Sequence, residues 1–147
     1  MLLRAATPSD REPVTAFVFA ALRAHGIEPD DSDRDVGQLG AHPEKDELVA
    51  ELDGVVVGII LVEPLGAEEG WISKLFVDES ARGRGLGKAL LSAAVARAKE
   101  RGWKALHLRT RTVFTAAIAL YERTGWQREP DPPSRGVGHD LAYRLSL

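Results

Sequence analysis

The clearest chemical signal in the 147-residue chain is a glycine-rich segment that follows a short apolar run and precedes a helical pattern. It contains three alternating glycines and three flanking cations, namely Gly83, Gly85, Gly87, Arg82, Arg84 and Lys88. Glycine lets a backbone approach a ligand closely, and the first amides of a helix lack acceptors within that helix. The pattern therefore predicts a phosphate or pyrophosphate site at the start of the helix.

Two common phosphate-binding motifs do not fit this segment. A Walker loop requires Gly where Arg82 stands, and Ser or Thr where Ala89 stands. A dinucleotide fingerprint that starts at Gly83 requires Gly at Lys88. The sequence therefore indicates a different phosphate-bearing ligand.

Segments with the period of a strand and of a helix alternate along the chain, which predicts one mixed α/β domain over residues 1–147. We expect strands at 2–6, 47–52, 55–62, 71–77, 105–110, 126–128 and 141–145. Residues 64–70 are expected to form a loop. We expect helices up to Gly26, from about Gly85 to Gly102 and over 114–124, with a short helix before His42.

Composition limits the classes of function. The chain has a formal net charge of −3, which argues against a nucleic-acid partner, and it has no cysteine to form a disulfide or a nucleophile. The four histidines are scattered, so we expect no metal site. Neither a signal peptide nor a membrane-spanning run of ~20 apolar residues is apparent, so we expect a cytoplasmic protein without a membrane partner.

Two motifs together resemble the GNAT N-acetyltransferase superfamily. The pattern Arg-x-x-Gly-x-Gly, which follows Leu75-Phe76-Val77, resembles its acyl-CoA-binding loop. The segment from Ala117 to Trp126 resembles its Ala-x-x-Leu-Tyr-x-x-x-Gly-Phe helix. The order of elements also matches. The resemblance implies a mixed, mostly antiparallel central sheet of six to seven strands flanked by about four helices.

The resemblance also implies acetyl-CoA as co-substrate, without a metal, and an amine as acceptor. Backbone groups of Leu75, Phe76 and Val77 would pair with the pantetheine arm. The segment after Arg82, comprising Gly83, Arg84, Gly85, Leu86, Gly87 and Lys88, would hold the pyrophosphate. Tyr121 would donate a proton to the departing thiolate. Members often carry Asn in the cofactor site where this chain has Phe114, and those that acetylate ribosomal proteins often carry Glu where it has Arg109.

The general base is open at the level of the sequence. Glu63 and Glu69 are the nearest candidate carboxylates, and Ser73 could hold a relay water. Because the chain has no cysteine to carry the acetyl group, we expect direct attack in a ternary complex. The acidic residues between Glu28 and Asp35 could select a cationic amine, or could form a solvated loop with little to bury.

Structural interpretations stand beside these functional ones. The chain could be an inactive CoA-binding sensor of the same fold, and Tyr121 could be a core aromatic. We expect His107 and Arg109 to face solvent, and Trp71, Trp103 and Trp126 to pack. His139 and Asp140 are expected to cap a turn before the last strand. A homodimer is the common expectation for such proteins.

Overall fold

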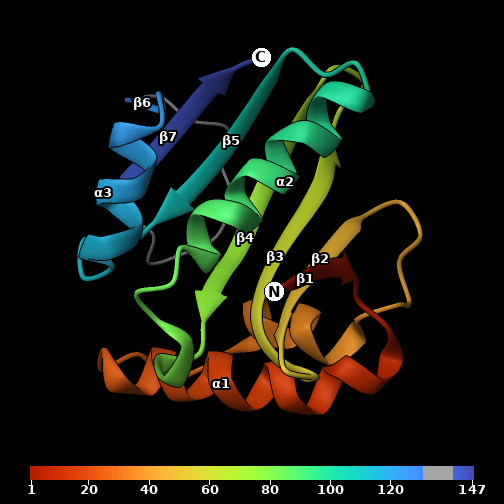
Figure 1. The fold of residues 1–147 in the computed structure, drawn as a ribbon. Helices are drawn as coiled ribbons and strands as arrows, with labels where there is room; N and C mark the ends of the chain where they lie inside the picture. Colours follow the sequence, from red (N-terminus) through yellow and green to blue (C-terminus); the bar gives the residue numbers. More distant parts are fainter. Residues whose placement is uncertain (131–140) are drawn as a thin grey trace.

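A computed structural model describes residues 1–130 and 141–147. Its centre is a sheet of seven strands in the order β1-β2-β3-β4-β5-β7-β6 (Figure 1). The strands are β1 (Leu2–Ala5), β2 (Asp46–Leu52), β3 (Val55–Leu65), β4 (Glu69–Val77), β5 (Ala105–Thr110), β6 (Gln127–Arg128) and β7 (Leu141–Ser146). All neighbours pair antiparallel except β4 and β5, which pair parallel. The mixed, mostly antiparallel sheet is therefore confirmed.

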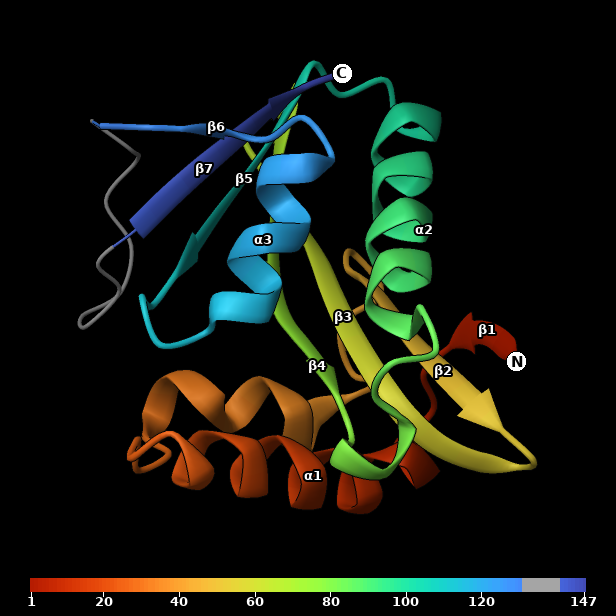
Figure 2. The ribbon, with the colours of Figure 1, turned by 60° about the vertical axis from the view of Figure 1, so that its left-hand side comes forward.

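Helices cover both faces of this sheet (Figures 1 and 2). On one face lie α1 (Arg11–Ala24) and the 3-10 helix η2 (Asp31–Gln38), and on the other lie α2 (Leu86–Glu100) and α3 (Thr115–Arg123). The short 3-10 helix η1 (Pro8–Asp10) directly precedes α1, and η3 (Glu79–Ala81) lies between β4 and α2. Strand β3 shows why both faces need cover, because Ile59 packs toward α1 and Ile60 packs toward α2.

The expected loop at residues 64–70 is mostly strand. Pro64 pairs with Gly70, and only residues 66–68 form the turn between β3 and β4. Strand β2 pairs with β3 only as far as Val62, so the missing N–H of Pro64 lies where β3 has a single neighbour. Proline is tolerated at such a position, which is why the two strands run on past it.

The acidic segment also differs from expectation, because it has a hydrophobic anchor. Val36 and Leu39 are 0% exposed and belong to the core under α1. The Asp30 side chain caps η2 by accepting a hydrogen bond from the Ser32 amide at 2.8 Å. The segment is therefore a 3-10 helix anchored to the core, although the side chains of Glu28 and Asp31 remain 77% and 90% exposed.

The expected burial of individual side chains is confirmed for some residues and wrong for others. Trp71, Trp103 and Trp126 are buried, as expected. His107 is only 3% exposed, so the expectation that it faces solvent is wrong; carboxylates on neighbouring elements bind both of its ring nitrogens. The turn expected at His139 and Asp140 lies outside the described residues.

Candidate active site

The two central parallel strands pair only briefly and then separate. Residues 69–71 of β4 pair with residues 105–107 of β5, and no pairing continues beyond them within the described strands (Figure 2). A cavity of about 580 Å³ opens at this point, lined by β4 from Ile72 to Val77 and by β5 from Leu108 to Thr110. Beyond residue 71 this edge of β4 has no strand partner among the described strands, so an extended amide chain could pair with it.

A bulge in β4 shapes the opening. Ile59 pairs with Phe76 whereas Leu61 pairs with Ser73, so β4 carries an extra residue opposite β3. Lys74 lies in the bulge with φ +55°, a left-handed conformation that is costly for a residue with a side chain. Bulges of this kind redirect side chains, and Ser73, Lys74 and Leu75 all line the cavity.

The glycine-rich loop forms one end of the cavity. Gly83 and Gly85 have φ values of +80° and +76°, which glycine alone adopts without strain. The amide of Ala89 donates to the carbonyl of Gly85 at 3.0 Å, so the amides of the preceding helical residues have no acceptor in α2. No acidic side chain lies in the first turn of α2. The free amides and the positive end of the helix dipole therefore form a cradle for an anion.

Most of the predicted cofactor residues meet in this cavity. Its lining includes Leu75, Phe76, Val77, Arg82, Gly83, Gly85, Leu86, Gly87, Lys88, Phe114 and Tyr121. Arg84 is exposed and lies outside the lining. The ring of Phe114 contacts Phe76 and His25, with centroids 5.7 and 4.9 Å apart, and so forms an aromatic wall where an amide side chain was expected in the family pattern.

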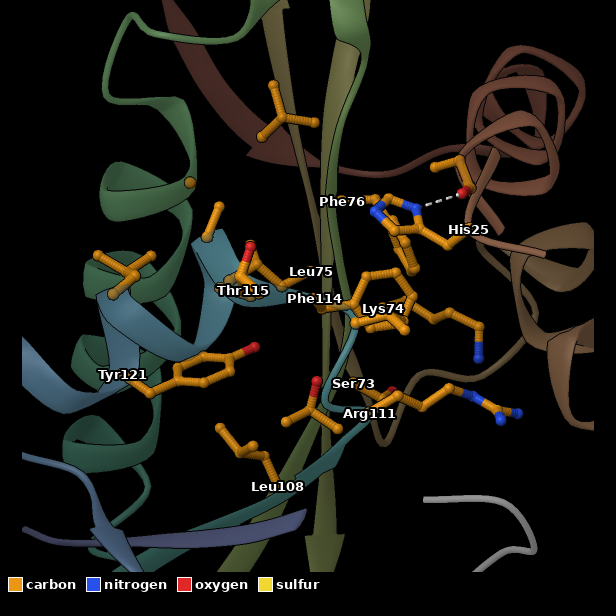
Figure 3. Close-up of a pocket in the computed structure, with 18 of the residues that line it drawn as sticks. His25, Ser73, Lys74, Leu75, Phe76, Leu108, Arg111, Phe114, Thr115 and Tyr121 are labelled. Atoms are coloured by element: carbon orange, nitrogen blue, oxygen red, sulfur yellow. Dashed lines mark hydrogen bonds between the residues drawn. The ribbon is translucent and has the colours of Figure 1, made fainter. Parts of the chain in front are cut away.

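Tyr121, the expected proton donor, lines this cavity. The residue is 5% exposed, and its ring contacts Trp126 and Tyr143. Its hydroxyl points toward β4 across the cavity (Figure 3). Burial raises the pKa of the Tyr121 hydroxyl, because the phenolate would lose its solvation. The side chain is therefore a neutral proton donor at physiological pH.

Comparisons with known proteins agree with this geometry. The profile of the Acetyltransferase (GNAT) family matches residues 14–126. The chain belongs to this family. The uncharacterized N-acetyltransferase YjgM of Escherichia coli K12 is 30% identical over 141 residues, which are 86% of this chain and 81% of that protein. Against several other curated N-acetyltransferases the chain spans half of their length or less.

Solved GNAT structures share the fold. A GNAT acetyltransferase from Staphylococcus aureus Mu50 superposes with a TM-score of 0.91 over 99% of this chain and 98% of that one, at 21% identity. The PaiA N-acetyltransferase of Thermoplasma acidophilum, solved in complex with coenzyme A, gives a TM-score of 0.79 over 99% of this chain and 98% of that one, at 15% identity. The architecture of the GNAT chain is thereby confirmed.

The two candidate carboxylates of this GNAT chain lie away from the cavity. Glu63 lies 3.6 Å from the ammonium of Lys45. Glu69 lies 3.1 Å from Nε2 of His107, whose Nδ1 meets Glu129 at 2.9 Å. Neither Glu63 nor Glu69 lines the cavity, whereas Ser73 does. The geometry therefore favours other groups for proton transfer.

The cavity lining also contains charged or titratable residues that the sequence did not single out, among them His25, Lys74 and Arg111 (Figure 3). His25 follows α1, and its Nδ1 lies 2.9 Å from the carbonyl oxygen of Ala21. A carbonyl only accepts, so Nδ1 donates this hydrogen bond, and Nε2 has no hydrogen-bond partner among the described residues. A single histidine after a helix gives no signal of this role, although Arg111 directly follows a predicted strand at the sheet opening.

Neither a metal site nor a membrane span is found in the described part of the chain. No group of three or more His, Cys, Asp or Glu side chains there could hold a metal ion. No described helix is long and apolar enough to cross a membrane.

Proposed function

We propose that the protein transfers the acetyl group of acetyl-CoA to a primary amine of a small molecule or peptide, in the cytoplasm, by direct attack within a ternary complex. The observation that carries the proposal is a single cavity that joins three parts. It runs from the glycine cradle at α2, past Tyr121, to the opening between α1, η2 and β5.

Acetyl-CoA would bind along this cavity in an extended form. The amides at the start of α2 would hold its pyrophosphate, helped by Arg82 and Lys88. The edge of β4 from Leu75 to Val77, which lies beyond the pairing with β5, would pair with the amides of the pantetheine arm. The acetyl group would then lie near the β4 bulge, where a backbone amide can polarise the thioester carbonyl.

The amine would enter from the side of α1 and η2. Its nitrogen attacks the thioester carbon, a C–N bond forms, and the C–S bond breaks. An ammonium must lose a proton before it can attack, and we assign this proton to Nε2 of His25. After the attack the nitrogen still carries one proton too many, which it gives up to solvent. Tyr121 donates its proton to the departing thiolate, and solvent returns a proton to Tyr121. The products are an amide and CoA.

Amine-dependent release of CoA thiol tests this proposal. Purified protein is incubated with acetyl-CoA and a panel of small amines and peptides, and the acetylated product is identified by mass spectrometry. We expect release of one CoA for each amide formed. If acetyl-CoA raises the melting temperature but no amine is acetylated, the chain is a CoA-binding sensor instead of an enzyme.

A further inference from the structure

The side of the cavity next to η2 carries charged groups of both signs, and most of them are already bound. Asp33 accepts from the amide of Asp30 at 2.9 Å with one oxygen and lies 3.2 Å from the ammonium of Lys74 with the other. Lys74 also lies 3.3 Å from Asp35. Asp30 accepts from Ser32 at 2.8 Å and 2.6 Å with the same oxygen. The carboxylates of Asp30, Asp33 and Asp35 therefore already have partners that hold η2 in place.

Arg111 differs from these groups. It is half-buried, directly follows β5 and lines the cavity. Within the described residues its guanidinium makes no hydrogen bond or ion pair. The pKa of Asp30 is lowered mainly by the hydrogen bonds from Ser32, and the charge of Arg111 adds to this effect. Its side chain extends on the same side as that of Lys74, toward η2 (Figure 3). A guanidinium presents a planar set of donors that matches the two oxygens of a carboxylate.

We propose that Arg111 binds a carboxylate of the acceptor, so that the acceptor is an amine that also carries a carboxylate, such as an amino acid or a short peptide. The inference rests on the proposed function and refines its substrate. An acceptor with a carboxylate differs from the cationic acceptor that the acidic residues between Glu28 and Asp35 could select. Asp30 is engaged in capping η2, and Asp33 and Asp35 are paired with Lys74. The guanidinium would orient the acceptor so that its amine faces the β4 bulge.

The test compares amino acids with their carboxamides. Glycine, leucine, phenylalanine, glutamate and lysine are each assayed beside the C-terminal carboxamide, which keeps the amine and the side chain but removes the charge. For the preferred side chain we expect kcat/KM of the acid to exceed that of the amide by roughly tenfold or more. Arg111→Gln should abolish this preference through KM, and Arg111→Lys should keep part of it.

Arg97→Gln, an exposed loss of the same charge on α2, is the control and should keep the preference. Acetyl-CoA should raise the melting temperature of all variants equally, which shows that the cofactor site is intact. An amide that is acetylated as well as its acid, or an equal loss on both with Arg111→Gln, overturns the inference while leaving the proposed function standing. If no amine is acetylated, calorimetric binding of the same acids and amides to the protein–CoA complex decides the role of Arg111 separately.

Discussion

The ammonium of Lys74 lies 3.2 Å from a carboxylate oxygen of Asp33, and this ion pair ties the bulge of β4 to η2. The two residues are far apart in the sequence, and both are nearly buried, with side chains 12% and 11% exposed. Asp35 binds the same ammonium. The pair therefore fixes one wall of the cavity against the strand on which the acetyl group is expected to lie.

Lys74→Met should destabilise the protein. The change keeps a Cβ at the left-handed position, so the strain of the backbone is not relieved. It removes the cation to which the carboxylates of Asp33 and Asp35 are paired. We expect the free energy of unfolding to fall by about 2 kcal/mol, measured by urea titration. Lys99→Met, on the exposed face of α2, is the control. Equal midpoints for the two variants would contradict a structural role for the pair.

Gly87→Glu should block acetyl-CoA without harming the fold. Gly83 and Gly85 have positive φ, so substitutions there would strain the backbone, whereas a Cβ at Gly87 would meet only Leu120 and Val77, at 3.7 and 4.0 Å. A carboxylate in the first turn also suits the helix dipole, so the apo protein should melt no lower than the parent protein. The rise in melting temperature with acetyl-CoA should disappear.

Ala96→Glu is the matched control, because it adds the same charge on the exposed face of the same helix. It should keep the full ligand-induced rise. If acetyl-CoA still raises the melting temperature of Gly87→Glu, the pyrophosphate does not bind at the start of α2.

Tyr121→Phe should lower kcat and leave acetyl-CoA affinity nearly unchanged. The hydroxyl is needed when the thiolate leaves, not when the cofactor binds, and general acid catalysis is typically worth ~10²–10⁴-fold. Tyr143→Phe also removes a tyrosine hydroxyl, one that donates to Glu122 at 3.0 Å outside the cavity, and it should keep its kcat. A loss below about threefold for Tyr121→Phe, with chemistry rate-limiting, would assign Tyr121 to core packing.

Both tyrosines of the chain should resist ionisation in the folded protein. Burial raises the pKa of Tyr121, and burial together with a hydrogen bond to Glu122 raises that of Tyr143. The unfolded chain loses these protons near pH ~10 while the folded chain keeps them, so the free energy of unfolding falls as pH rises above that value. Phenolate absorbance should therefore appear only together with the loss of native circular dichroism. Its appearance in a still-native protein would contradict the burial of both rings.

Much of the fold could be predicted from the sequence because its signals are local. Alternating and continuous apolar runs predicted the strands, and β5 was expected at the residues where it occurs, Ala105–Thr110. The glycines that allow the cradle at α2 are likewise visible as a pattern. Such features depend on residues close in sequence, so reading the chain in order is enough to find them.

The acceptor side could not be predicted in the same way, because it depends on register and on distant partners. The bulge at Lys74 shifts the pairing of β4, and no local pattern announces it. Glu69 lies only a few residues before Ile72, where β4 begins to line the cavity. It nevertheless belongs to the part of β4 that pairs with β5, and its carboxylate contacts His107. The role of Lys74 became apparent only once η2 was placed against β4.

His25→Ala should lower kcat far more than Glu63→Gln or Glu69→Gln. Nδ1 of His25 donates to the carbonyl of Ala21, so we assign the role of proton acceptor to Nε2. His25 lines the cavity, whereas Glu63 and Glu69 do not. We expect a loss of roughly 10²-fold or more for His25→Ala, partly restored by added imidazole, and changes within about threefold for the glutamate variants.

His42→Ala, outside this cavity, is the control for loss of an imidazole. Restoration by imidazole separates a lost proton acceptor from a lost contact with Phe114, because a free imidazole can accept a proton without rebuilding the aromatic wall. If Glu69→Gln proves as damaging as His25→Ala and imidazole restores neither, the amine proton does not go to His25.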